Sequence, residues 1–175
     1  MDDDGKLDLA RANTDSDSVS VLLGAGDGSF AAGTDQATGK HPVFVTFADI
    51  DGDRLLDMLT ADSSSNELGV YLGLGNAEFA ARVGYAAGSY PSHVSVADLN
   101  GDRLPDSIVV NTFSASVSVR PGVGRGAFGD RIDYTVGQFP EAAAIADLNE
   151  DGSADFAVVN SLSNSVSVFL GTRTN

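Results

Sequence analysis

One acidic nonapeptide recurs along this chain, and each copy begins 49 residues after the copy before it. The intact copies run from Asp49 to Asp57, from Asp98 to Asp106 and from Asp147 to Asp155, with Asp or Asn at positions 1, 3, 5 and 9. An earlier copy opens the chain at Asp2, so that its first position would precede Met1. A fixed period of this length indicates a tandem array of one supersecondary unit. The fold must therefore be one that stacks a repeated unit.

Each unit shows the same order of apolar and polar segments. A corner such as His41-Pro42 comes first, and a short apolar run leads from it into the acidic loop. A second apolar run follows the loop, and a third run alternates strictly, with Val117 and Val119 on one face and Ser118 between them. Alternation with period 2 is typical of a strand with one buried face.

A fourth extended segment closes each unit. A glycine-rich turn leads to it through Phe30, Phe79 and Phe128, which are again 49 residues apart. Short strands separated by Gly and Pro at roughly 10-residue spacing indicate an all-β repeat, and we find no helical periodicity of useful length. One four-stranded antiparallel sheet per unit predicts the blades of a β-propeller.

The repeat predicts a single domain over residues 1–175. Its blades would span approximately residues 1–39, 40–88, 89–137 and 138–175. The first blade would lack its first strand and the last blade its fourth, which leaves unpaired strand edges at both ends. We therefore expect a partial ring, or a ring completed by oligomerisation, and a repeat block that was cut from a longer protein or lost its natural start.

Composition excludes several classes of protein. The chain has no Cys, so no disulfide framework can stabilise it. The net charge of −15 argues against nucleic acid and anionic membrane surfaces as partners. A hydrophobic content of 42% with ordered alternation argues against a disordered acidic protein. No apolar run reaches the length of a membrane span, and no signal peptide is evident.

Clustered oxygen ligands in a tight loop are suited to a hard cation. Calcium takes six to eight oxygens, whereas magnesium demands a tight octahedron, so a flexible loop favours calcium. The side chains at positions 1, 3, 5 and 9 and the backbone carbonyl at position 7 are the expected ligands, with both oxygens of position 9. The predicted ligands are Asp49, Asp51, Asp53, Leu55 and Asp57; Asp98, Asn100, Asp102, Leu104 and Asp106; Asp147, Asn149, Asp151, Ser153 and Asp155; and, in the incomplete first loop, Asp2, Asp4, Lys6 and Asp8. We thus expect about three full Ca²⁺ sites and a fourth partial site.

Two observations qualify this prediction. Asp, Asn and Gly also favour tight turns without any metal. Position 6 is Gly5 or Gly152 in two loops but Arg54 or Arg103 in the others, and a positive φ there would strain each arginine and weaken its site.

The loops are not EF-hands. An EF-hand places a bidentate Glu at position 12 and flanks its loop with helices. Position 12 here is Thr60, Val109 or Val158, each within an expected strand.

The order and spacing of segments within each unit resemble those of the FG-GAP/VCBS repeats, the blades of integrin-alpha-type propellers. It combines a strand, the D-x-[DN]-x-D-x-x-x-D loop, a second strand, a V-S-V-type strand, a glycine turn and Phe. The resemblance implies that each calcium loop joins the first and second strands of a blade. It also implies a propeller of usually seven blades, on secreted or cell-surface proteins that serve adhesion and binding.

The leading functional hypothesis is a calcium-stabilised, non-catalytic scaffold that binds a protein or glycan ligand on a propeller face. An enzyme is not expected, because His41 and His93 occupy different repeat positions and no catalytic constellation accompanies them. A lectin-like propeller is one alternative, although Trp is absent and Tyr85 and Tyr134 are better explained as strand residues. A truncated or designed fragment that forms homo-oligomers through its open blade edges is another.

Overall fold

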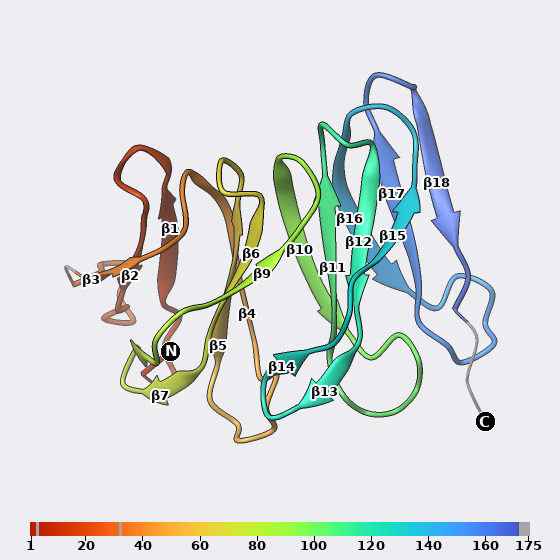
Figure 1. The fold of residues 1–175 in the computed structure, drawn as a ribbon. Helices are drawn as coiled ribbons and strands as arrows, with labels where there is room; N and C mark the ends of the chain where they lie inside the picture. The colour runs from red at the N-terminus through yellow and green to blue at the C-terminus, as the bar shows by residue number, and fades with distance from the viewer. Residues whose placement is uncertain (3, 32, 172–175) are drawn as a thin grey trace.

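The computed structural model describes residues 1–2, 4–31 and 33–171, so Asp3 of the first acidic loop lies outside the described residues. Four larger antiparallel sheets follow one another along the chain, and we call them blades 1 to 4 (Figure 1). Blade 1 contains β1 (Leu9–Asn13), β2 (Ser18–Leu22) and β3 (Thr34–Ala37); blade 2 contains β4 (Pro42–Ala48), β5 (Asp57–Asp62), β6 (Glu67–Tyr71) and β9 (Val83–Ala86); blade 3 contains β10 (Pro91–Ala97), β11 (Asp106–Asn111), β12 (Ser116–Arg120) and β15 (Ile132–Thr135); and blade 4 contains β16 (Pro140–Ala146), β17 (Asp155–Asn160) and β18 (Ser165–Phe169).

Every strand pairs with the next large strand of its sheet, and every pair is antiparallel. The register repeats with the sequence, since Ser118 pairs with Asp133 in blade 3 as Gly69 pairs with Gly84 in blade 2. A 3-10 turn, η1 (Thr14–Ser16), is the helical element of the described residues. The predicted all-β fold of propeller blades is confirmed. No helix of the described residues has the length and apolar character to span a membrane.

The glycine-rich segments contain more structure than the sequence indicated. They were expected to be plain turns, but β7 (Gly73–Gly75) pairs with β8 (Glu78–Phe79), and β13 (Gly122–Gly124) pairs with β14 (Ala127–Phe128). Asn76 and Ala77 both have positive φ angles, as do Arg125 and Gly126. Two consecutive residues with positive φ are typical of the tight turns that close β-hairpins. Each segment is therefore a short hairpin that ends in the repeated Phe.

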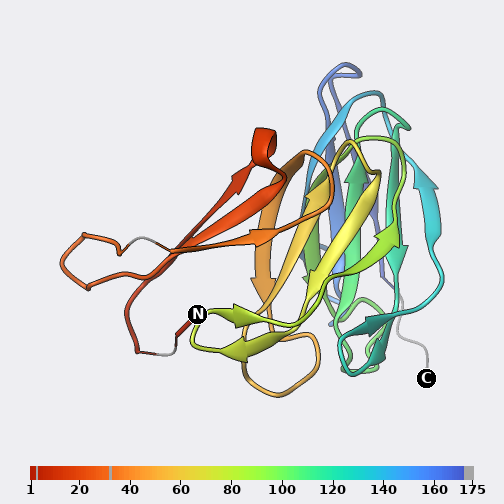
Figure 2. The ribbon, with the colours of Figure 1, turned by 60° about the vertical axis from the view of Figure 1, so that its left-hand side comes forward.

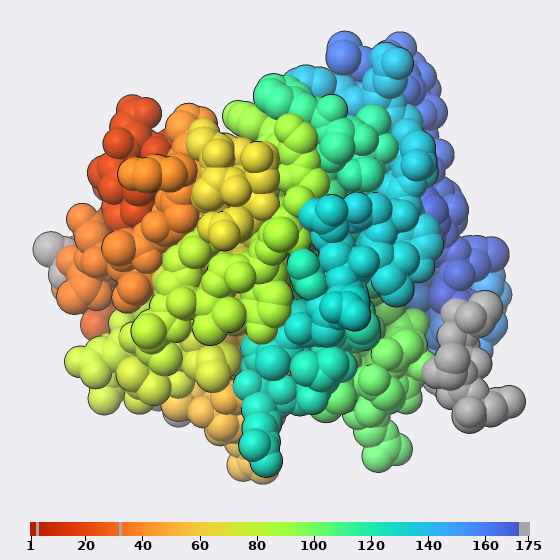
Figure 3. Space-filling model, viewed as in Figure 1, coloured from red at the N-terminus to blue at the C-terminus, as the bar shows by residue number. Residues whose placement is uncertain are grey.

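Consecutive blades pack face to face, with β4, β10 and β16 side by side (Figures 1 and 2). In the space-filling view the blades follow one another from left to right in sequence order (Figure 3). The core consists of apolar clusters between successive sheets. Leu59, Leu68, Val94 and Val109 belong to one such cluster, in which strands of blades 2 and 3 meet. Alternating strand residues thus supply the faces that neighbouring blades bury.

The outer face of blade 4 is different. Val166 and Val168 of β18 are 58% and 54% exposed, whereas Val117, the counterpart of Val166, is fully buried. Within the described residues, β18 pairs only with β17, and β1 pairs only with β2. Ring closure by oligomerisation remains a prediction.

Candidate metal centre

The acidic loops occupy equivalent places in the blades. Loop 2 (49–57) joins β4 to β5, loop 3 (98–106) joins β10 to β11, and loop 4 (147–155) joins β16 to β17, while loop 1 (2–8) precedes β1. Loops 2 and 3 lie at the lower ends of their blades in Figure 1, on the same side as the short hairpins.

Loop 2 brings three of its predicted ligands together. Carboxylate oxygens of Asp49, Asp51 and Asp57 all lie within 4.8 Å of one another. They are the one group of three or more His, Cys, Asp or Glu residues that meets this distance among the described residues. Loops 3 and 4 have Asn100 and Asn149 at position 3, so an amide oxygen takes the place of one carboxylate there.

The first residue of each intact loop organises the turn around it. Asp49 accepts hydrogen bonds from the N–H groups of Gly52 at 2.7 Å and Arg54 at 2.9 Å. Asp98 accepts the equivalent bonds from Gly101 at 2.7 Å and Arg103 at 2.8 Å. Short acidic side chains stabilise tight turns in this way by bonding their own backbone. The loop amides thus fix where the position-1 carboxylate lies.

Positions 5 and 7 are linked in the same manner. The carboxylate at position 5 accepts the N–H of position 7 at 2.8 Å in each of the three intact loops: Asp53 from Leu55, Asp102 from Leu104 and Asp151 from Ser153. The contribution of the position-7 carbonyl to a cation stays a prediction.

Two residues of each intact loop have left-handed backbone conformations. At position 6, φ is 76° for Arg54, 71° for Arg103 and 82° for Gly152. Position 6 therefore has a positive φ, as the predicted weakening of the arginine-bearing sites requires. Both arginines adopt a conformation that favours glycine. Position 4 is left-handed as well, and in loop 4 it is Glu150 with φ 61°. Loop 4 thus carries its strained residue at position 4, which the sequence did not indicate.

The last acidic residue of each loop has a second role. Asp57 is fully buried, and its two oxygens accept the N–H groups of Ile50 and Gly73, both at 2.7 Å. Asp106 and Asp155 accept the same pair of bonds from the equivalent residues, Leu99 and Gly122 or Leu148 and Gly171. Burial raises the pKa of the Asp57 and Asp106 carboxyls, and the backbone N–H donors oppose that rise.

Position 9 therefore ties each intact loop to the glycine that follows the third strand of its blade, and in blades 2 and 3 that glycine begins the short hairpin. Sequence reasoning assigned both of its oxygens to a cation and missed this structural role. The signal was present, because Gly24, Gly73, Gly122 and Gly171 each follow the position-9 Asp by 16 residues.

Comparison with known proteins agrees with this repeated loop. The FG-GAP-like repeat matches residues 1–60 and 49–109. The chain belongs to the FG-GAP-like repeat family. No curated protein sequence matches the chain.

A solved structure described as "Crystal structure of BBS1N in complex with ARL6DN, soaked with lead" is similar to this FG-GAP-like repeat chain, with a TM-score of 0.63 and 15% sequence identity. The match covers 97% of the present chain, which spans 54% of the length of the matched one. At this identity the similarity supports the fold.

Loop 1 of the FG-GAP-like repeat chain differs from the other loops. The Lys6 ammonium pairs with the Asp4 carboxylate at 2.9 Å, and this hydrogen bond lowers the pKa of Asp4. Asp8 accepts the N–H of Gly24 at 2.9 Å and pairs with the Met1 amino group at 2.9 Å. Loop 1 thus already contains cationic partners for two of its four predicted ligands.

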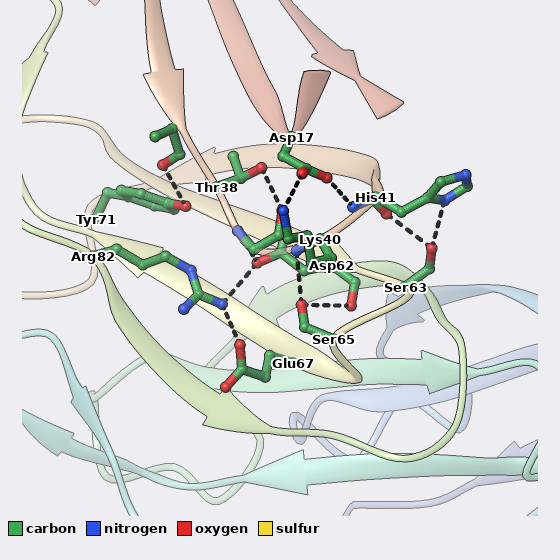
Figure 4. A network of polar contacts seen from close by, with 12 residues as sticks. Asp17, Thr38, Lys40, His41, Asp62, Ser63, Ser65, Glu67, Tyr71 and Arg82 are labelled. Carbon is green, nitrogen blue, oxygen red and sulfur yellow. Dashed lines mark hydrogen bonds and ion pairs between the residues drawn. The ribbon is translucent and has the colours of Figure 1, made fainter. Parts of the chain in front are cut away.

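A polar network between blades 1 and 2 was not foreseen from the sequence (Figure 4). Arg82 donates to Asp62 at 2.9 Å and to Glu67 at 2.7 Å, although Asp62 is fully buried. In blade 3 Asn111 takes the place of Asp62 and donates to Ser116 at 3.3 Å and to Ser118 at 2.8 Å. Arg131, the counterpart of Arg82, pairs there with Asp133 at 3.2 Å. Blade 2 thus has a buried carboxylate where blade 3 has the neutral amide of Asn111.

The two histidines lie where the repeat predicted them. His41 lies at the corner before β4, with its ring Nδ1 2.8 Å from the Ser63 hydroxyl. His93 is a strand residue of β10, and its ring packs against that of Phe44 in a tilted arrangement with ring centroids 4.3 Å apart. Burial lowers the pKa of His93.

Proposed function

We propose that the chain is a non-catalytic binding scaffold whose blades are stabilised by calcium ions in the acidic loops. The observation that carries this proposal is the meeting of Asp49, Asp51 and Asp57 oxygens within 4.8 Å in loop 2. Carboxylates at such distances repel one another unless a cation lies among them. An all-oxygen donor set on a flexible loop fits calcium better than a transition metal.

The residues that would hold the ion are those at positions 1, 3, 5, 7 and 9 of loops 2, 3 and 4. Loop 2 offers four carboxylates, and loops 3 and 4 replace one of them with the amide of Asn100 or Asn149. The internal hydrogen bonds of each loop support the proposal, because they hold the side-chain oxygens close before any ion arrives. Loop 1 is a weaker candidate, since Lys6 already neutralises Asp4.

The ion would supply positive charge where each blade's first strand turns into its second. A ligand that binds only the folded chain, at a thousand times its dissociation constant, stabilises that chain by about 4 kcal/mol. Calcium would then cross-link a chain that has no cysteine. FG-GAP repeats are typical of extracellular or surface proteins, and we propose a secreted or cell-surface location, where calcium is abundant.

The fold supports the proposed binding role. Propeller faces present loops from several blades to one partner, and binding residues concentrate on loops held by a rigid scaffold. The similar BBS1N structure is described as a complex with ARL6DN, which supports a protein as the partner of this scaffold. A glycan ligand is the alternative that a binding screen would separate.

Calorimetric titration of calcium into the chelator-stripped full chain tests the metal proposal. We expect about three ions per chain, and about two in an Asp49→Asn/Asp53→Asn variant that disables loop 2. Asp15→Asn, which removes an acidic residue outside the loops, is the matched control and should leave the stoichiometry unchanged. Absence of binding heat at millimolar calcium would overturn the proposal and leave the loops as turns.

A further inference from the structure

We propose that Asn100 in loop 3 is a site of spontaneous deamidation, at which water converts the side-chain amide into a carboxylate by way of a cyclic imide. Asn100 is followed by Gly101, and no other asparagine of the sequence precedes a glycine. The modification itself is independent of calcium binding. It rests on the groups that the backbone of loop 3 brings to this amide at the lower end of blade 3 (Figure 1).

The reaction begins when the backbone nitrogen of Gly101 attacks the side-chain carbonyl carbon of Asn100. A bond forms between that nitrogen and Cγ, the bond from Cγ to Nδ2 breaks, and Nδ2 leaves as ammonia with the proton that the Gly101 nitrogen loses. Water then opens the cyclic imide at either of its carbonyl carbons. The products are aspartate and isoaspartate, in which the main chain runs through the former side chain. Water is the only other reactant.

The attacking nitrogen already faces a proton acceptor. The Gly101 N–H donates to Asp98 Oδ1 at 2.7 Å. A carboxylate in that position can accept the proton while the new bond forms, which is general base catalysis. Gly101 is exposed, so water reaches the imide.

The carbonyl group under attack is polarised by a second hydrogen bond. Asn100 Oδ1 accepts the Asp102 N–H at 2.8 Å. A backbone N–H at this distance stabilises the negative charge that develops on the oxygen during the attack. Asn100 Nδ2 also donates to Asp102 Oδ2 at 3.0 Å, so both ends of the amide are held by the loop. Positioning of the reacting groups in this way lowers the entropic part of the barrier.

Loop 4 provides an internal comparison at the same repeat position. Asn149 makes the equivalent bonds, since its Oδ1 accepts the Asp151 N–H at 3.0 Å and its Nδ2 donates to Asp151 Oδ2 at 2.9 Å. The next residue is Glu150 with φ 61°, where loop 3 has Gly101 with φ 80°. The Cβ of Glu150 crowds the nitrogen that would have to attack and restricts its backbone, whereas glycine leaves both free. We therefore expect deamidation at Asn100 and not at Asn149.

The modification changes the oxygen donors of loop 3. Aspartate at residue 100 gives this loop the acidic pattern of loop 2, in which oxygens of Asp49, Asp51 and Asp57 lie within 4.8 Å of one another. Isoaspartate instead lengthens the main chain and shortens the side chain, so that it displaces the carboxylate. This consequence rests on the proposed calcium function: aspartate should raise, and isoaspartate should lower, the affinity of loop 3 for calcium.

The test incubates the freshly prepared full chain in chelator at neutral pH and follows each asparagine by peptide mass spectrometry. Conversion of the amide to a carboxyl group raises the mass of the peptide that contains it, and released ammonia is measured in parallel. We expect Asn100 to react at least about tenfold faster than Asn149. A rate at Asn100 no higher than that at Asn149 would overturn the proposal.

Reciprocal variants test the role of the glycine. Gly101→Glu gives loop 3 the Asn-Glu sequence of loop 4, and Glu150→Gly gives loop 4 the Asn-Gly sequence of loop 3. We expect the first variant to slow the reaction at Asn100 about tenfold and the second to speed the reaction at Asn149 by a similar factor. If Gly101→Glu does not fold, Glu150→Gly still decides, because it replaces a residue of positive φ with glycine. Unchanged rates in the folded variants would contradict the mechanism.

The contribution of the folded loop is measured against a peptide of residues 97–107, which has the same sequence without the blade. We expect the folded chain to react at least as fast as the peptide. Asp98→Asn, which removes the proton acceptor, should slow the folded chain about threefold and steepen the dependence of its rate on pH. A folded chain that reacts about tenfold more slowly than the peptide would show that the hydrogen bonds protect the amide, and it would overturn the proposal.

Calorimetric titration of calcium into the fresh chain, the aged chain and Asn100→Asp tests the consequence for loop 3. We expect tighter binding at one site in Asn100→Asp and weaker binding in the fraction of aged chain that contains isoaspartate. Equal affinities in all three would contradict this consequence. If none of them binds calcium, the calcium proposal fails, whereas the rates measured in chelator still decide whether Asn100 deamidates.

Discussion

Asp57 and Gly73 are joined by a hydrogen bond of 2.7 Å from the Gly73 N–H to the buried Asp57 carboxylate. The other oxygen of Asp57 accepts the N–H of Ile50, so one side chain holds together the start of loop 2, the start of β5 and the start of β7. A Cβ at Gly73 would lie 2.5 Å from the carbonyl oxygen of Leu56, so the backbones approach too closely there for a side chain. The repeated aspartate and glycine therefore form one structural unit.

We predict that Asp57→Asn destabilises the chain with or without calcium. An amide nitrogen cannot accept the N–H that one carboxylate oxygen now accepts, so the variant should lose about 2 kcal/mol of unfolding free energy. Urea denaturation in chelator measures the effect. Asp53→Asn, which removes an exposed ligand of the same loop, should change stability mainly when calcium is present. Equal losses in the two variants under chelator would contradict the role given to Asp57.

Arg82 compensates the buried charge of Asp62. Removing one partner of a buried ion pair costs roughly 3 kcal/mol, because the remaining charge is left unpaired. We therefore expect Arg82→Met to be strongly destabilising and Asp62→Asn/Arg82→Met to recover part of the loss. A double-mutant cycle by urea denaturation measures this coupling. Additive effects of the two substitutions would show that the pair does not interact energetically.

The same pair predicts a pH dependence. Burial raises the pKa of Asp62 above its ordinary value of 3.8, and Arg82 opposes the rise. Without Arg82 the pKa rises further, so the folded state holds the Asp62 proton more tightly than the unfolded chain does. Deprotonation then opposes folding, and the destabilisation in Arg82→Met should grow as pH rises above about 4. Stability curves of the variant and the parent chain from pH 4 to 7 test this sign.

The lowered pKa of His93 predicts that the chain becomes less stable in acid. Burial lowers its pKa below 6.5, so the unfolded chain binds the proton more readily than the folded chain. Stability should fall as pH decreases below about 6.5, and this part of the fall should disappear in His93→Phe. Thermal unfolding in chelator at pH 7.5 and 5.5 measures the difference between the two proteins. A His41→Phe variant is the control, and an identical pH response in all three proteins would argue against His93 as the titrating group.

Glycine at position 6 should relieve backbone strain. Arg54 and Arg103 have φ angles of 76° and 71°, where a side chain is unfavourable and glycine is not. Arg54→Gly is expected to stabilise the chain by up to about 1 kcal/mol and to tighten calcium binding at loop 2. Leu56→Gly changes a nearby loop residue outside the positive-φ set and should destabilise. Calorimetry and denaturation of both variants decide between relief of strain and a simple loss of side-chain contacts.

Much of the fold follows from local pattern. The 49-residue period and the alternation at Val117 and Val119 determined where strands occur and that one face of each is buried. The acidic spacing located each loop between the first and second strands, and Arg54 and Arg103 marked the position whose φ is positive. These features depend on residues close together in the chain, so the sequence expresses them directly.

Other features required the packed molecule. The sequence offered no reason for Asp62 to be buried, because its environment depends on Arg82 in the segment before β9 and on backbone from the linker after blade 1. Nor did it show that Phe79 and Phe128 seal junctions between blades while Phe30 remains exposed. Periodicity indicates which face of a strand is buried, but it does not identify the residues of other segments that cover that face. The sequence alone thus determined the repeat, its strands and the candidate ligands, whereas tertiary packing decided which charges are buried and which junctions are filled.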